Sequence, residues 1–336
     1  LPFTFGSDDY EDGEHTIYYH SVDLLGNSEE TQSEEDFLDR TLPTITDDYE
    51  NGWKNTDQIV TLSPDDDEGC GIKEVKYCLE EDCGVENGAI LENDYEIEFN
   101  GDQDTILRYQ TWDNVWHASL IGEDEIKIDT IAPITTSSFT SEEWQNDDVE
   151  INLSCEDPKL NGIASGCEWT KYCSDSENTC NPETEYTGTI NYGEEGIHYI
   201  RFFSKDYADN EEAVKSQLIK IDETAPRMIL LNPTEEEAEN VQKCVQSVVA
   251  IVSDGEGSGT KRVWAELWDR REEKVREEEM KLTIYGTYEA LIDKQLPAGE
   301  YTLKVYAEDN AKNNGIKEQS EILEEGVFVE YIEDPI

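Results

Sequence analysis

The chain has 336 residues, of which 25 are Lys or Arg and 81 are Asp or Glu, so its formal net charge is −56. Such a surface repels phosphates and anionic headgroups, which excludes nucleic acid and anionic membranes as expected partners. Aromatic residues make up 10% of the chain, which argues against disorder. At ~1 M salt the Debye length falls to about 3 Å and screens most self-repulsion. We therefore expect a protein of a hypersaline medium.

One strand pattern recurs along the chain. It alternates apolar and polar residues, which predicts a strand with one buried face, and each copy ends on Asp. The four aspartates are separated by 90, 93 and 103 residues (113 − 23, 206 − 113, 309 − 206). A spacing of about 95 residues is the size of one β-sandwich. The copies occupy residues 17–23, 107–113, 200–206 and 303–309.

The front half of the repeat also recurs. A strand at 59–63, 149–154 or 245–252 leads into an acidic, Gly-containing loop, and a further strand follows at 72–78, 168–173 or 261–267. Residues 272–281 are charged enough for a short helix, but we favour a hairpin because residues 282–285 resume the alternation. Pro43, Pro133 and Pro226 mark junctions, since Pro cannot donate to a central ladder.

These patterns predict an all-β chain of tandem immunoglobulin-like antiparallel β-sandwich repeats, arranged as beads in a rod. Whole repeats are expected at 43–132, 133–225 and 226–336, and residues 1–42 contain only the back half of another. Half a sandwich exposes an apolar face and unpaired strand edges. We expect its missing strands to come from upstream sequence or, by strand addition, from a neighbouring chain. No apolar run approaches the ~18 residues of a membrane span.

The eight cysteines favour disulfides in an oxidising compartment. The expected pairs are Cys155–Cys167, Cys173–Cys180 and Cys78–Cys83. Aligning Gly69-Cys70 with Gly166-Cys167 leaves Cys70 without a local partner. Cys70 and Cys244 are then either free or paired with each other, within one chain or between subunits. The alternative is a zinc site of four cysteines that includes Cys70, Cys78 and Cys83.

Acidic loops offer the oxygen ligands that calcium prefers. One set lies between two predicted strands, and a second lies where one sandwich meets the next. The alternative is that counter-ions are held loosely and that Asp and Asn cap their own turns. No other cofactor is expected. The candidate ligands are Asp65, Asp66, Asp67, Glu68, Asp23, Asp206, Asp209 and Asn210.

The repeat resembles the bacterial and archaeal Ig-like repeats of large cell-surface proteins and adhesins. Residues 13–29 and 196–211 carry the resemblance, together with Thr224-Ala225-Pro226. It covers essentially the whole chain, although the third whole repeat departs most. The resemblance implies stalk, spacer or adhesive modules, and the family carries no catalytic residues to transfer.

We therefore expect a non-enzymatic, extracellular structural protein, a stalk, filament or sheath segment of a salt-loving microbe. One alternative is an adhesin module that binds a partner cell or glycan, and another is an accessory array of a secreted enzyme. Copies of the chain, neighbouring repeats, and a surface glycan or protein are the expected partners. Asn152 begins a glycosylation sequon, which matters only outside the cell.

Overall fold

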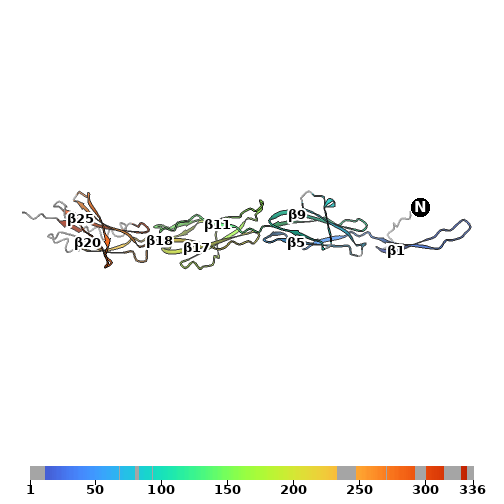
Figure 1. The fold of residues 1–336 in the computed structure, drawn as a ribbon, viewed down its shortest axis with the longest axis horizontal. Helices are drawn as coiled ribbons and strands as arrows, with labels where there is room; N and C mark the ends of the chain where they lie inside the picture. The colour runs from blue at the N-terminus through green and yellow to red at the C-terminus, as the bar shows by residue number, and fades with distance from the viewer. Residues whose placement is uncertain are drawn as a thin grey trace, which may run out of the picture. The chain divides into compact units, whose positions relative to one another are not determined.

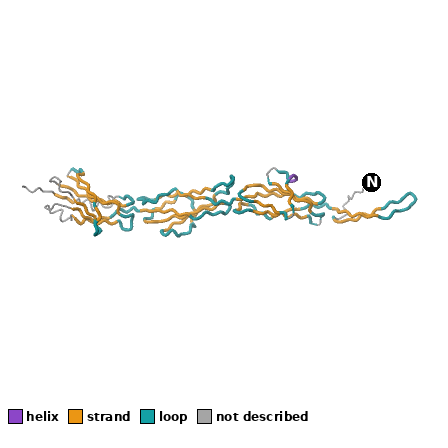
Figure 2. The backbone as a smooth tube through the Cα atoms, in the orientation of Figure 1, coloured by secondary structure: helices purple, strands orange, loops and turns teal. Residues whose placement is uncertain are grey.

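The computed structural model describes residues 12–67, 69–79, 83–92, 94–232, 247–269, 271–291, 300–313 and 327–330. Within them, the short 3-10 turn η1 (Val85–Asn87) is the one helical element, and the other regular segments are strands (Figure 2). The chain divides into two compact units that interleave in sequence. The first unit contains residues 1–134, 155–169 and 204–212, and the second contains 135–154, 170–203 and 213–336.

A hairpin opens the described part of the first unit. Strands β1 (Gly13–Tyr19) and β2 (Gln32–Leu38) pair antiparallel, with Gly13 opposite Leu38 and Tyr19 opposite Gln32. Tyr18 is 71% exposed, and Leu24 and Leu25 in the connecting loop are almost fully exposed. The pair alone buries little apolar surface, and the origin of strands that would complete it stays a prediction.

A β-sandwich follows in the first unit. Its three-stranded sheet, in the order β3–β5–β8, faces a five-stranded sheet in the order β4–β10–β9–β6–β7, and β5 and β9 mark the two layers in Figure 1. Strand β4 runs parallel to β10, whereas the other paired strands are antiparallel. The strands are β3 (Thr44–Asp47), β4 (Gly52–Lys54), β5 (Gln58–Asp65), β6 (Ile72–Cys78), β7 (Ala89–Leu91), β8 (Glu96–Phe99), β9 (Gln103–Asp113) and β10 (Gly122–Ile128).

The alternation of β9 explains its place in this sandwich. Leu107, Tyr109, Thr111 and Asp113 are buried, while the residues between them are more exposed. The apolar members of this set meet residues of the opposite sheet, such as Val60, in one hydrophobic core. Two facing sheets with such a core, together with the parallel β4–β10 pair at one sheet edge, form an immunoglobulin-like sandwich.

The second unit contains two further hydrophobic cores. Around the first, a four-stranded sheet in the order β15–β14–β17–β18 is accompanied by the pairs β11–β13 and β12–β16. A parallel bridge between Gln145 and Ile221 repeats the β4–β10 relation. These strands are β11 (Ile134–Ser137), β12 (Val149–Ile151), β13 (Leu153–Glu156), β14 (Cys167–Asp175), β15 (Thr184–Glu185), β16 (Ile190–Tyr192), β17 (Gly196–Asp206) and β18 (Lys215–Ile221).

Around the last core, the sheets have the orders β19–β20–β24–β23 and β22–β21–β25–β26. No helix forms over residues 272–281; β22 covers most of this segment and pairs antiparallel with β21 in the expected hairpin. The strands are β19 (Arg227–Asn232), β20 (Ser247–Ser253), β21 (Thr260–Asp269), β22 (Lys274–Glu279), β23 (Lys281–Leu282), β24 (Tyr288–Leu291), β25 (Glu300–Asp309) and β26 (Val327–Glu330). The tandem, all-β immunoglobulin-like architecture is therefore as the sequence predicts.

A buried acid in the first sandwich makes a prediction about pH. Burial and the nearby Asp47 carboxylate raise the pKa of Asp124 to about 6, and its Oδ2 has no hydrogen-bond partner in the described part of the chain. The folded state therefore binds the proton of Asp124 more tightly than the unfolded chain does. Its contribution to the free energy of unfolding is fully present below about pH 4 and is lost as the pH rises through 6. Asp124→Asn should raise the free energy of unfolding by about 1–3 kcal/mol at pH 8 and by much less at pH 4.

Denaturant unfolding of wild type and variant across this pH range measures the effect. Glu98→Gln, on an exposed position of β8, is the matched control for removing one charge. An equal gain in the free energy of unfolding from both variants at pH 8 would show that the effect comes from overall charge. It would contradict the role of Asp124.

Candidate cation sites

Acidic side chains converge at three equivalent places in the described part of the chain. In each set, one ligand atom of every member lies within 4.8 Å of the others. Seven of these nine aspartates are buried, Asp157 and Asp254 are partly buried, and Asp113, Asp129, Asp206 and Asp309 are 0% exposed. We call the sets the first, second and third cluster. They are Asp39, Asp66, Cys70 and Asp113; Asp129, Asp157 and Asp206; and Asp222, Asp254 and Asp309.

The first aspartate of each cluster directly follows a strand: β2 of the hairpin, or β10 or β18, the last strand of a sandwich. Its Oδ1 accepts the N–H of the residue two positions later, which closes a tight turn. Its Oδ2 accepts an N–H from the acidic loop of the next repeat. The donors are Cys70 to Asp39 at 2.9 Å, Ser165 to Asp129 at 2.7 Å and Ser258 to Asp222 at 2.6 Å.

The second aspartate lies in that acidic loop. Its Oδ2 accepts the N–H of a glycine, and the pairs are Asp66 with Gly71, Asp157 with Gly166 and Asp254 with Gly259, each at 2.6 Å. The glycines have φ of +87°, +87° and +88°, a left-handed conformation that side chains disfavour. In all three aspartates Oδ1 is buried and has no hydrogen-bond partner in the described part of the chain.

The third aspartate ends the recurring strand that the sequence singles out. Asp206 is typical: its Oδ1 accepts the N–H groups of Ala208 at 2.9 Å and Asn210 at 2.8 Å, and its Oδ2 accepts Nδ2 of Asn210 at 2.9 Å. Asp309 is held similarly by Asn313. In the first cluster, His117 replaces this Asn, and its Nδ1 lies 2.9 Å from Oδ2 of Asp113.

Carboxylates this close and this buried repel one another. Burial, followed by the neighbouring acids of the cluster, raises the pKa of Asp254 to about 6. The pKa of Asp66 and that of Asp157 are raised with the same leading cause, although the hydrogen bond from the loop glycine opposes it. Burial acts in the same direction on Asp39, but hydrogen bonds from Cys70 and Thr41 outweigh it and lower the pKa to about 2. A bound cation would offset both the repulsion and the desolvation.

The structure brings together only some of the predicted ligands. Asp66 and Asp206 each belong to a cluster, and Asn210 supports the second by donating to the backbone oxygen of Asp129 at 2.7 Å. Asp23 makes the same kind of turn as Asp206, but it is exposed and joins no cluster among the described residues.

Other predicted ligands serve different contacts. Asp65 accepts the N–H of Asp67, and Asp209 pairs with Lys205. Glu68 lies outside the described residues. The sequence reasoning did not name Asp39, Asp129 and Asp222 as ligands, although each stands just before a predicted junction.

The structure joins Cys78 to Cys83, Cys155 to Cys167 and Cys173 to Cys180, the pairs expected from the sequence. Cys78 and Cys83 therefore offer no thiolate to the alternative four-cysteine zinc site. Cys70 forms no disulfide among the described residues, and its expected partner Cys244 lies outside them.

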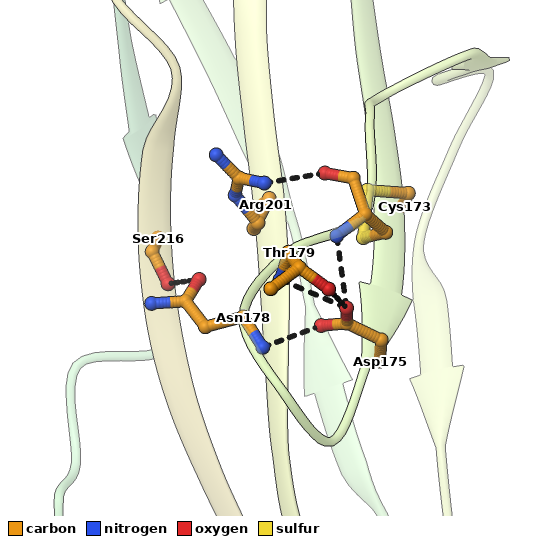
Figure 3. Close-up of a disulfide and its surroundings, with 7 residues drawn as sticks. Cys173, Asp175, Asn178, Thr179, Arg201 and Ser216 are labelled. Atoms are coloured by element: carbon orange, nitrogen blue, oxygen red, sulfur yellow. Dashed lines mark hydrogen bonds between the residues drawn. A yellow bond between two sulfur atoms is a disulfide. The ribbon is translucent and has the colours of Figure 1, made fainter.

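Figure 3 shows how the loop around the Cys173–Cys180 disulfide is fixed. The carboxylate of Asp175 accepts the N–H groups of Asn178, Thr179 and Cys180 at 2.8–2.9 Å, and the Thr179 bond is the leading reason that the pKa of Asp175 is lowered. Arg201 donates to the backbone oxygen of Cys180 at 2.6 Å.

The alignment of Gly69-Cys70 with Gly166-Cys167 is wrong by two residues. The hydrogen bonds match Cys70 with Ser165 and Ser258, and Gly71 with Gly166 and Gly259. Pro64 and Ile72 then occupy the places of Cys155 and Cys167. The alignment matched the Gly-Cys dipeptide that both loops contain, but Gly69 and Gly166 do not hold equivalent places in the hydrogen-bond pattern. Cys70 therefore occupies the position that Ser165 and Ser258 take in the other repeats, and not the position of the disulfide-bonded Cys167.

The comparisons with known proteins found similarity to solved structures in fold alone. No protein-family model and no curated protein sequence matches the chain. A tetra-tandem repeat in the extending region of a large adhesion protein is 14% identical, with a TM-score of 0.36, covering 91% of this chain and 80% of its own. Three N-terminal domains of the highly immunogenic outer capsid protein of bacteriophage RB49 are 10% identical, with a TM-score of 0.33, covering 81% and 96%. Likeness at this level does not identify a function.

Two further observations concern the surroundings of the chain. No helix in the described segments has the length and apolar character needed to cross a membrane. Asn152, the sequon residue, is exposed between β12 and β13, and its Oδ1 accepts the hydroxyl of Thr189 at 2.7 Å.

Proposed function

We propose that this chain is a segment of an extracellular surface protein in which divalent cations join the end of each β-sandwich to the loops of the next. The observation that carries the proposal is the recurrence of buried aspartates drawn from two consecutive repeats. The second and third clusters contain only oxygen donors. Each offers three carboxylates, and in each one buried carboxylate oxygen accepts no hydrogen bond among the described residues. Calcium prefers oxygen ligands in flexible geometry, and water can complete its shell.

The disulfides support an oxidising, extracellular setting. The charge of −56 supports a high-salt medium, in which screening reduces repulsion between the many exposed acids. A stalk or filament segment fits these features, since cations at the junctions would restrict bending between repeats. The adhesive and enzyme-accessory alternatives stay predictions.

Calcium should therefore bind the chelator-treated full chain and raise its stability. At a free concentration of 100 times the dissociation constant, the expected gain is about 2.7 kcal/mol per site. Isothermal titration gives the number of sites, and thermal unfolding gives the gain. Asp157→Asn and Asp254→Asn should each abolish one calcium site.

Asp65→Asn, an exposed acid outside the clusters, should leave calcium binding unchanged. NaCl at matched ionic strength controls for screening. Equal stabilisation by NaCl and by CaCl₂, with no saturable calcium binding, would contradict the proposal.

A further inference from the structure

We infer that the first cluster is a site for a softer divalent ion of the zinc class, bound by the Cys70 thiolate and the carboxylates of Asp39, Asp66 and Asp113. This deepens the proposed function, because it assigns different ions to different junctions. The second and third clusters contain only oxygen donors, whereas the first adds sulfur.

The donor set fits such an ion. Thiolate ligands favour zinc over calcium, and zinc takes four ligands in tetrahedral geometry. With metal–ligand distances of about 2.0–2.3 Å, neighbouring tetrahedral ligands lie roughly 3.3–3.8 Å apart. The four donor atoms already lie within 4.8 Å of one another. Small side-chain movements would therefore complete the coordination sphere.

The surroundings of the Asp66 and Asp113 carboxylates favour binding of a metal ion in different ways. Asp66 is 7% exposed, and its Oδ2 accepts the N–H of Gly71. Its buried Oδ1 has no hydrogen-bond partner among the described residues. Asp113 is 0% exposed and is oriented by the N–H groups of Val115 and His117. The His117 ring also lies beside Asp113, with Nδ1 2.9 Å from Oδ2, but the two atoms lack hydrogen-bond geometry, so this buried oxygen accepts no hydrogen bond among the described residues.

The other repeats provide an internal comparison. Ser165 and Ser258 occupy the place of Cys70, and their hydroxyl oxygens accept the N–H groups of Ala208 at 3.2 Å and Ala311 at 3.0 Å. The same loop geometry therefore carries oxygen in two repeats and sulfur in one. When the metal binds, the thiol proton passes to solvent and a sulfur–metal bond forms.

Cobalt(II) is the probe, because a thiolate ligand produces a sulfur-to-cobalt charge-transfer band. The full chain, stripped with chelator and with its disulfides intact, should bind cobalt with this band, and zinc should displace it. Cys70→Ser should remove the band and weaken zinc binding by at least about tenfold, because loss of a residue that only orients a ligand already typically costs that much. Ser258→Cys should create a second band at the third cluster. Cys244→Ser is the control for the other cysteine outside the three disulfides, and it should keep the band.

Three results would overturn the inference: no charge-transfer band in the wild type, a band that persists in Cys70→Ser, or a band lost in Cys244→Ser. None of these affects calcium binding by the second and third clusters, which titration of Asp157→Asn and Asp254→Asn measures separately. Failure of the zinc-class assignment and failure of the proposed function are thus distinguishable.

Discussion

Asp206→Ala should lower the free energy of unfolding by about 2–4 kcal/mol in excess calcium. Its buried carboxylate accepts three hydrogen bonds, two from backbone N–H groups and one from the Asn210 side chain. Removing the acceptor of a buried donor costs the desolvation of that donor, about 1–3 kcal/mol. In chelator the loss should be smaller, because the substitution also relieves repulsion with Asp129 and Asp157. Denaturant unfolding under both conditions measures the difference.

Asp23→Ala is the matched control. Asp23 makes the same turn, accepting the N–H groups of Leu25 and Asn27 and the side-chain amide of Asn27, but it is exposed and outside the clusters. Its substitution should change stability little, and equally with and without calcium. Losses of equal size in both variants, independent of calcium, would show that the turn matters and the cluster does not.

Replacing both Cys155 and Cys167 by Ser should cost about 3 kcal/mol, since the bridge closes a loop of 13 residues (167 − 155 + 1) and so restricts the unfolded chain. The effect should reach beyond stability, because the loop carries Asp157 and Ser165. We expect weaker calcium binding at the second cluster and unchanged binding at the third. Unfolding and calcium titration of the double variant test the two expectations.

The Cys173–Cys180 bridge offers the comparison. It closes a loop of eight residues (180 − 173 + 1) that contains no cluster acid, so its removal should cost about 2.5 kcal/mol and leave calcium binding unchanged. Equal calcium affinities in both double variants and the wild type would show that the Cys155–Cys167 bridge does not position the second cluster.

Local patterns in the sequence were sufficient for the architecture. The alternation in β9, β17 and β25 follows from side chains pointing to opposite faces of a strand, so it can be read without tertiary information. The disulfides Cys78–Cys83 and Cys173–Cys180 close short loops, which bring the two sulfurs near each other whatever the rest of the chain does. The recurring Asp at the end of each such strand was visible for the same reason.

Only the tertiary structure decided which of the 81 acids meet. Each cluster combines an aspartate after one repeat with two from the next, and such contacts depend on how the chain turns at the junction. Loop length mattered as well: Asp66 and Gly71 are five residues apart and Asp157 and Gly166 are nine apart, yet both pairs make the same hydrogen bond. The shared Gly-Cys dipeptide therefore misplaced Cys70, because a hydrogen bond constrains where two groups lie in space and not which local sequence or how much chain surrounds them.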